Sequence, residues 1–241
     1  MAYNFLGLVN DVNRRLNEVP LTESNFSSAV GFYGHAKDAV NSAIQDISQS
    51  QFEWPFNYVE QEETLSVGIT KYAFPPDAKS VDMDSFRIKF DQTLDSRTQK
   101  LRVISYEEYL EKYVDQEYNT DTSQYGAPDF VFRTPGLEYG VVPAPDKAYE
   151  IVYEYYTTTV DLINATDVPY IPEIYRHVII DGAMYYAYMF RSNEQAAALS
   201  KRKFEEGIKN MRTILINRYD YLRSTYRPTV RRTSYVYRLS S

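Results

Sequence analysis

Helical and strand-like patterns occupy separate parts of this 241-residue sequence, and their order restricts the fold more than any other feature. Near the N-terminus, apolar residues recur at spacings of three and four over residues 5–16 and again over 24–50, which predicts two helices. The same spacing returns after Pro172, where it predicts a helix over residues 173–191 and a last helix over 194–222. Either Ser192 or Asn193 is expected to cap that last helix.

The middle of the chain, residues 57–158, carries a different pattern. Seven short runs are rich in β-branched and aromatic residues, and stretches such as "PPDAKS" and "PAPDK" separate most of them. Most connections are too short for a parallel crossover, so the strands are predicted to be antiparallel. One helix interrupts them, because Ser105 and Glu108 form an S-x-x-E capping box in front of "YEEYLEKYVDQEY".

The chain is therefore predicted to be an α+β protein. Its two ends, residues 1–56 and 159–226, are expected to form a helical bundle. Residues 57–158 are expected to form an antiparallel β domain with one short helix, inserted between the second and third long helices. Residues 227–241 follow the bundle as an extended C-terminal arm.

Composition argues against several kinds of site. The absence of cysteine excludes disulfides, thiolate metal sites and cysteine nucleophiles, and only two histidines, His35 and His177, are available for a metal. No stretch approaches the roughly 18 apolar residues of a membrane span, and the first residues lack the features of a signal peptide. We therefore expect a protein made in a cytoplasm, with no cofactor, no metal and no membrane partner.

Candidates for catalysis are few. The pairs that could act as acid and base or orient a metal are Asp82 with Asp84, Glu107 with Glu108, and His177 with Asp181. None has a partner visible in the sequence that would shift a pKa or complete a metal site, and acids on solvated strands and first helical turns are common. Nucleophile-elbow, Walker, Rossmann, calcium-loop and H-E-x-x-H motifs are all missing. The chain is predicted not to be an enzyme.

Aromatic residues suggest contact surfaces. The single tryptophan, Trp54, stands in "FEWPF", where it is either a platform for a sugar or, as we favour, an apolar plug between helix and sheet. The chain also holds 24 tyrosines, a residue type that favours half-buried surfaces and interfaces. A tyrosine-rich sheet surface is an equally good explanation, and the sequence leaves both open.

Charge is distributed unevenly. The formal net charge is −7, yet residues 221–241 contain five arginines and no acidic residue, so the rest of the chain carries −12. An acidic body repels phosphate, which argues against a nucleic-acid-binding protein. The same repulsion suits a channel through which DNA slides without sticking.

The basic C-terminal segment has the pattern of an extended arm. Pro228 prevents the preceding helix from continuing, and Tyr235, Tyr237 and Leu239 fall on one face of a strand. A lone strand must join a sheet edge or stay disordered. A disordered end without a role and a DNA-binding tail are alternatives. An arm that orders on another subunit explains both the arginines and the tyrosines, and its predicted docking residues are Arg227, Pro228, Arg231, Arg232, Tyr235, Tyr237, Arg238 and Leu239.

Several stretches in order along the chain resemble one known family. They include "FLGLVNDVNRRLNEV", "HAKDAVNSAIQDISQSQFEWPF", "GITKYAFPPDAKSVD", "YGAPDFVFR", "GVVPAPDKAYEIVYEYY" and "DVPYIPEIYRHVIIDGAMYYAYMFR". Together they are similar to the head-to-tail adaptor proteins of short-tailed bacteriophages, also called tail tubular protein A. The resemblance implies a helical bundle with an inserted β domain and no enzyme activity. It also implies a place in the virion at the portal vertex, after synthesis in the bacterial host cytoplasm.

The resemblance further implies partners. Such adaptors form a ring, usually of twelve copies, beneath the portal protein, and carry the tail nozzle and tail fibres. Their C-terminal segment docks on the portal, which would be the role of residues 227–241, and genomic DNA passes through the ring without sequence-specific binding. We predict that some of Glu53, Glu60, Glu62 and Glu63, or else acidic residues of the helices, line this channel. Another tail structural protein, such as a nozzle or connector-completion protein, is the main alternative, and a glycan-binding or cell-wall-degrading module is a distant one.

Overall fold

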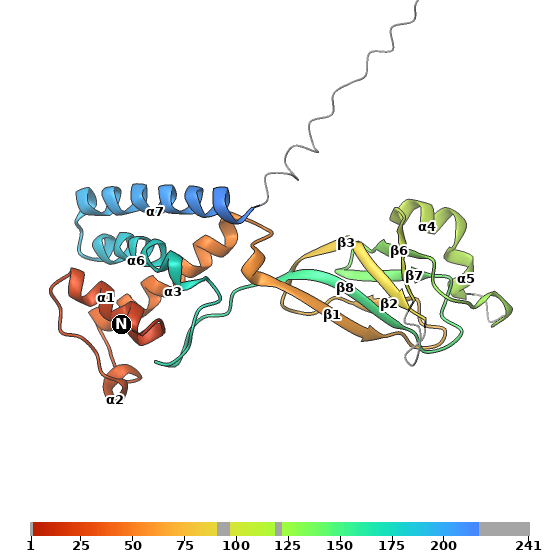
Figure 1. Ribbon diagram of the computed structural model, residues 1–241, viewed down its shortest axis with the longest axis horizontal. Coiled ribbons are helices and arrows are strands. Elements are labelled where there is room, and N and C mark those ends of the chain that lie inside the picture. Colours follow the sequence, from red (N-terminus) through yellow and green to blue (C-terminus); the bar gives the residue numbers. More distant parts are fainter. Residues whose placement is uncertain (1, 91–96, 119–121, 217–241) are drawn as a thin grey trace, which may run out of the picture.

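The computed structural model describes residues 2–90, 97–118 and 122–216, and it is elongated, with helices at one end and strands at the other (Figure 1). The helical end contains α1 (Phe5–Arg15), α2 (Glu23–Phe26), α3 (Phe32–Ser50), α6 (Arg176–Phe190) and α7 (Glu194–Leu215). The β end contains two four-stranded sheets. Helices together with largely antiparallel sheets confirm the predicted α+β class; the predicted division into domains stays a prediction.

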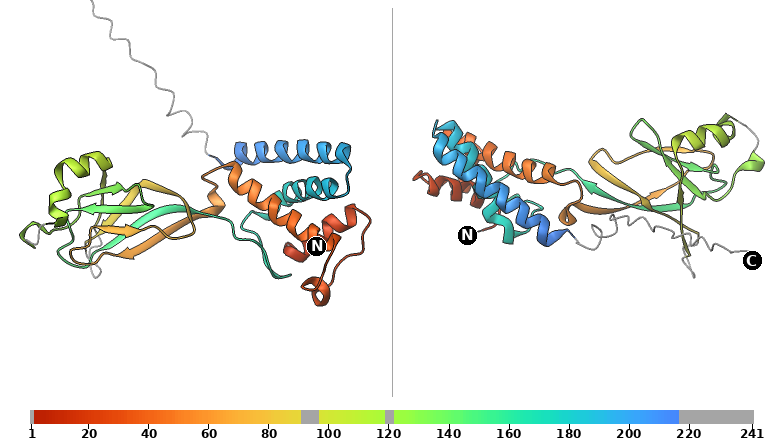
Figure 2. Two further views of the ribbon diagram at one scale, coloured as in Figure 1. Left: turned by 180° about the vertical axis from the view of Figure 1, so that it is seen from behind. Right: turned by 90° about the horizontal axis from the view of Figure 1, so that it is seen from above.

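At the helical end, α6 lies against α1, α3 and α7, and the apolar faces of these helices share one hydrophobic cluster (Figure 2). Small residues allow the close approach. A Cβ added to Gly182 of α6 would lie 2.7 Å from the Phe204 ring of α7 and 2.9 Å from the Ala43 Cβ of α3. Gly182 therefore occupies a position at which three helices meet without room for a side chain.

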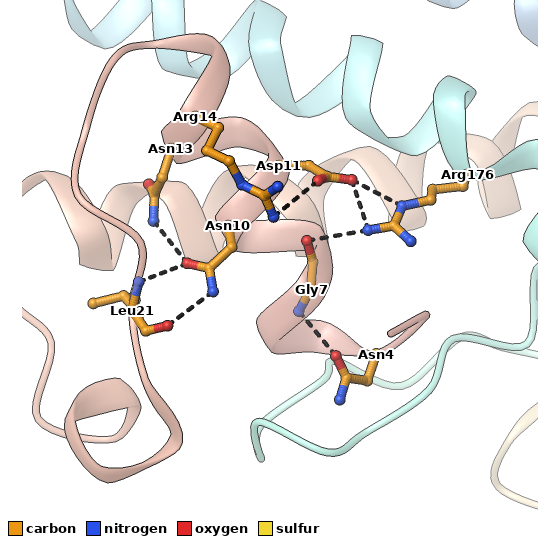
Figure 3. A network of polar contacts seen from close by, with 8 residues as sticks. All are labelled: Asn4, Gly7, Asn10, Asp11, Asn13, Arg14, Leu21 and Arg176. Atoms are coloured by element: carbon orange, nitrogen blue, oxygen red, sulfur yellow. Dashed lines mark hydrogen bonds and ion pairs between the residues drawn. The ribbon is translucent and has the colours of Figure 1, made fainter. Parts of the chain in front are cut away.

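Polar side chains of α1 fix the chain on both sides of it (Figure 3). The Asn10 side-chain amide donates to the Leu21 carbonyl at 2.9 Å and its oxygen accepts from the Leu21 N–H at 2.7 Å, so it replaces a strand partner for this loop. On the other side, Asp11 accepts two hydrogen bonds from the Arg176 guanidinium, at 2.7 and 2.8 Å. This ion pair joins α1 to the first residue of α6.

The helix predicted over residues 24–50 is divided in two. Between α2 and α3, Gly31 has a φ of 65°, a left-handed conformation that only glycine adopts without strain, and it begins α3 as the N-cap. Val30, which fits the apolar spacing, is consequently 79% exposed. Lys37, which interrupts the spacing, donates to the Phe26 carbonyl at 2.9 Å and so ties α3 back to α2.

The first sheet has the strand order β1-β8-β3-β4, and the second has the order β2-β7-β6-β5. The strands of the first sheet are β1 (Tyr58–Thr64), β8 (Glu150–Thr157), β3 (Ala78–Lys89) and β4 (Thr98–Lys100). Those of the second are β2 (Lys71–Ala73), β7 (Glu138–Val142), β6 (Phe130–Arg133) and β5 (Arg102–Val103). The two sheets enclose a second hydrophobic cluster, which includes Phe86, Tyr139 and Tyr153.

One strand pair departs from the antiparallel prediction, because β5 pairs with β6 in parallel. The connection between them is long enough for a crossover, since it contains α4 (Tyr106–Lys112) and α5 (Val114–Tyr118). The serine half of the predicted capping box is present, because the Ser105 hydroxyl accepts from the Glu108 N–H at 3.1 Å, whereas the Glu108 carboxylate bonds to Lys112 at 2.7 Å. The single predicted helix is interrupted at Tyr113, whose ring packs on Phe130 with centroids 5.7 Å apart.

The last helix also begins as predicted, because the Asn193 side chain accepts from the Ala196 N–H at 3.1 Å. It ends at Leu215, since Ile216 has extended backbone angles, and so it is about 33 Å long at 1.5 Å per residue. The predicted end at Leu222 lies outside the described residues. Pro172 stands in front of a short 3-10 turn, η3 (Glu173–Tyr175), that leads into α6.

Donors from three places bind the last turn of α3, where the helical end meets the β end. Trp54 donates its indole N–H to the Ile47 carbonyl at 2.7 Å. Lys79, on β3, donates to the carbonyls of Ser48 and Gln51, and Arg212, on α7, donates to that of Ser50. Carbonyls at a helix C-terminus have no partner within the helix, so these donors satisfy them. Lys79 in addition joins the β end to the helical end.

Candidate functional site

The predicted channel residues lie on β1 or just before it. Glu60 and Glu62 are exposed and share the outer face of the strand with Tyr58 and Thr64. Glu53 is also exposed, in the segment between α3 and β1. The structure thus brings Glu60 and Glu62 together on one face; whether these residues line a channel stays a prediction.

Glu63 points the other way. Successive side chains of a strand alternate between its faces, so Glu63 faces the second sheet. There it accepts a hydrogen bond from the hydroxyl of buried Tyr139, with 2.8 Å between the oxygens. The sequence showed the alternation of β1, but it did not show that a buried tyrosine donates a hydrogen bond to Glu63.

Acidic residues continue from β1 across the outer face of the first sheet. Glu60 is directly opposite Glu154 on β8, and Glu154 is directly opposite Asp82 on β3. Like charges directly opposite one another destabilise a sheet, so strand pairing does not favour this row of three carboxylates. Nearby, Lys89 forms an ion pair with Glu62, so the negative charge is strongest at the end of the sheet nearer the helices.

The candidate catalytic pairs are separated by other partners. Asp84 pairs with Lys100 at 3.2 Å and Glu108 with Lys112 at 2.7 Å. Asp181 pairs with Arg15 of α1 at 2.8 Å, which makes it a contact between helices rather than a partner of a metal-binding histidine. Within the described residues, no group of three or more His, Asp or Glu side chains could hold a metal ion.

Trp54 is not a sugar platform, because its side chain is 0% exposed. Its ring stacks on Phe56 with centroids 5.3 Å apart and belongs to the helical hydrophobic cluster. The preferred interpretation of an apolar plug between helix and sheet is confirmed.

Composition suggested that the tyrosines lie either at half-buried interfaces or on an exposed sheet surface, but many of them lie in neither place. Tyr139 and Tyr153 are among the largest fully buried side chains, and both pack against Phe86 between the sheets, with centroid distances of 5.1 and 4.5 Å. Burial raises the pKa of Tyr139 strongly, and the neighbouring Glu63 carboxylate adds to that increase. Tyrosine therefore builds much of the β core with its ring, and in Tyr139 the hydroxyl also reaches a polar partner, Glu63.

This burial predicts a loss of stability at alkaline pH. Above pH 10 the unfolded chain releases the Tyr139 proton, whereas the folded protein keeps it. The contribution of Tyr139 to the free energy of unfolding is therefore complete below pH 10, and it declines by about 1.4 kcal/mol per pH unit as the pH rises further. Urea unfolding measured from pH 8 to pH 11.5 should show this decline. Tyr139→Phe should be less stable at pH 8 and lose less on the way to pH 11.5; an unchanged slope would contradict the assignment.

The predicted arm residues, from Arg227 to Leu239, lie outside the described residues.

The structure shows an exposed apolar surface that the sequence analysis did not single out, in the segment that joins β8 to α6. Its exposed residues are Val160, Ile163, Val168, Tyr170 and Ile174. The segment is held to α3 by Asn41, whose side chain bonds both the N–H and the carbonyl of Leu162, at 3.1 and 3.0 Å. In the sequence, the only signal for this surface was a set of apolar residues without helical spacing. Because Asn41 holds the segment in place, its exposed apolar side chains suit contact with another protein.

Comparison with protein families matches residues 3–232 to the SU10 adaptor protein family. A search of curated proteins found no match. No helix within the described part of the chain is both long and apolar enough to cross a membrane. The family match covers nearly the whole chain, including the helical end and the β end with the acidic outer face of its first sheet. The chain therefore belongs to the SU10 adaptor protein family and is a bacteriophage adaptor.

Proposed function

We propose that this protein is a ring-forming head-to-tail adaptor that joins the portal to the tail nozzle and lines the DNA channel between them. The proposal includes the finer assignment to the tail tubular protein A type of short-tailed phages, and a place at the portal vertex of the virion. The ring is expected to hold twelve copies. The protein acts through its surfaces and not through an enzymatic site.

The family match from residue 3 to residue 232 is the observation that carries this proposal. It includes Arg227, Arg231 and Arg232, the first part of the predicted arm, so the arm is partly within the family's pattern. In the proposal, residues 227–241 extend from the ring and dock on acidic groups of the portal.

Two surface features support the proposal. A ring contact joins one face of a copy to a different face of the next, so it requires two unlike surfaces on the same chain. The exposed apolar segment between β8 and α6 is one such surface, because apolar area excluded from water drives association. The acidic row formed by Glu60, Glu154 and Asp82 suits a wall past which DNA must slide, because carboxylates repel phosphate.

Co-sedimentation with the portal ring of the same phage tests the arm. The full-length protein is compared with a version that ends at Tyr226 and with a full-length variant in which Arg227, Arg231 and Arg232 are replaced by serine. We expect only the full-length wild type to sediment with the portal in a fixed ratio. The serine variant keeps the length of the arm, so its failure would show that the arginines provide the contact.

Other outcomes would change the assignment. Equal binding by all three proteins would place the portal contact on the body and leave the arm without its proposed role. Binding by none of them, together with binding of the wild type to the nozzle protein, would favour the alternative of another tail structural protein.

A further inference from the structure

The first sheet leaves a long strand unpaired on one side. β1 has seven residues and pairs within the described structure only with β8, so its other edge presents backbone N–H and C=O groups that a further strand could use. The inward-facing residues show that this edge is open. Val59, Gln61 and Glu63 remain partly exposed, whereas Ile151, Tyr153 and Tyr155, which face the same way on β8, are buried.

The other edge strands are less suited to pairing with a basic segment. They are only two or three residues long, and each carries a cation: Lys71 on β2, Lys100 on β4 and Arg102 on β5. β1 has no cation and three glutamates. Lysine and arginine at a sheet edge discourage pairing, and here they would also repel a basic strand.

The sequence contains a strand of matching length and opposite charge. Residues 233–239, "TSYVYRL", alternate like a strand and are as long as β1, and residues 221–241 contain five arginines without an acidic residue. On β1, Tyr235, Tyr237 and Leu239 would extend the inner face and cover the partly exposed Val59 and Gln61. Arg232 and Arg238 would then lie on the outer face, next to Glu60 and Glu62.

The chain can reach this edge. The Arg212 guanidinium, one turn before the end of α7, donates to the carbonyl of Ser50, and the chain from Ser50 leads through η1 (Pro55–Asn57) directly into β1. α7 thus ends beside the start of β1 (Figure 1). The 17 residues from Ile216 to Thr233 can span about 55 Å, more than twice the roughly 23 Å length of β1.

We infer that in the free protein residues 233–239 add as a fifth strand to the open edge of β1 in the same chain. The edge strand is thereby covered and the arginines are held against Glu60 and Glu62 until a partner takes the arm. This inference goes beyond the adaptor function, and it concerns this chain alone. Its failure would leave portal binding untouched, because its test contains no portal.

Hydrogen exchange of the full-length protein tests the added strand. Val236→Pro removes a donor from the middle of the segment and prevents pairing, whereas Ser224→Pro places the same residue before the segment and serves as the control. We expect those amides of residues 58–64 that point away from β8 to exchange at least about tenfold faster in Val236→Pro than in wild type, and the control to resemble wild type, because exchange follows local opening. Equal exchange in all three proteins would overturn the inference.

Disulfide trapping identifies which chain supplies the strand, since the protein has no cysteine of its own. Glu60→Cys with Val236→Cys places both thiols on the outer face, and Thr98→Cys with Val236→Cys is the control at the opposite edge of the same sheet. We expect the first pair alone to close within a monomer, at a rate independent of protein concentration. A disulfide formed only between chains would make a second copy the occupant and overturn the inference, as would equal trapping by both pairs.

Discussion

Trp54→Ala is expected to lower the free energy of unfolding by about 3–5 kcal/mol, because it removes a fully buried ring and leaves a cavity. The loss should be larger than for most single truncations, since the indole N–H also donates to the Ile47 carbonyl at 2.7 Å. Urea unfolding followed by far-ultraviolet circular dichroism measures the effect. Trp54 is the only tryptophan, so its fluorescence cannot be used for the variant.

Trp54→Phe is the matched control for this prediction. It keeps most of the apolar volume but loses the hydrogen bond, and we expect it to cost about 1–2 kcal/mol. A loss below about 1 kcal/mol in Trp54→Ala would contradict the role of the ring as the plug of the junction, because a buried aromatic truncation should exceed that. Loss of glycan binding in Trp54→Ala without loss of stability would favour the sugar platform that the structure rejects.

Gly182→Ala should destabilise the helical end by about 1–3 kcal/mol although alanine is the better helix former. The added Cβ would lie 2.7 Å from the Phe204 ring and 2.9 Å from the Ala43 Cβ, so either α7 or α3 has to move. Thermal unfolding followed by circular dichroism reports the change. Gly182→Leu should destabilise the helical end further, and it amplifies a small effect in the same assay.

Gly34→Ala is the comparison that isolates packing from helix propensity. Gly34 lies in the first turn of α3, and a Cβ there would meet nothing closer than the Ala29 carbonyl oxygen at 3.9 Å. We expect this variant to gain about 0.5 kcal/mol, since only the propensity term acts. If both glycine variants changed stability in the same direction, the three-helix contact at Gly182 would not limit the packing.

The sequence predicted the kinds of elements well because periodicity and caps are local. Ser105 and Asn193 cap the helices that they were expected to cap, and the strand runs fall within the two sheets. The break at Gly31 was harder to predict, because the apolar spacing continues through Val30 and only the backbone angle of the glycine shows the turn. The parallel pairing of β5 with β6 depends on where α4 and α5 return the chain, which is tertiary information.

The candidate surface was predictable only in part, for a similar reason. Strand alternation separates Glu63 from Glu60 and Glu62, but the sequence could not supply the pairing that places Glu154 and Asp82 beside Glu60. Register between strands distant in the chain creates that row of charge. The buried tyrosines were also misjudged, because composition describes how often a residue type occurs and not which face it occupies.

Lys79 of β3 bonds to the last turn of α3, and this contact makes the angle between the helical end and the β end a property of the single chain. In a closed ring every contact repeats, so an error in that angle would add up from copy to copy until the circle failed to close. Trp54, from the connecting segment, and Arg212, from α7, bind the same turn, so the turn that Lys79 reaches is itself held in place. The angle that each copy contributes to the curvature of the ring would then be set before assembly, and contacts with neighbouring copies would not have to impose it.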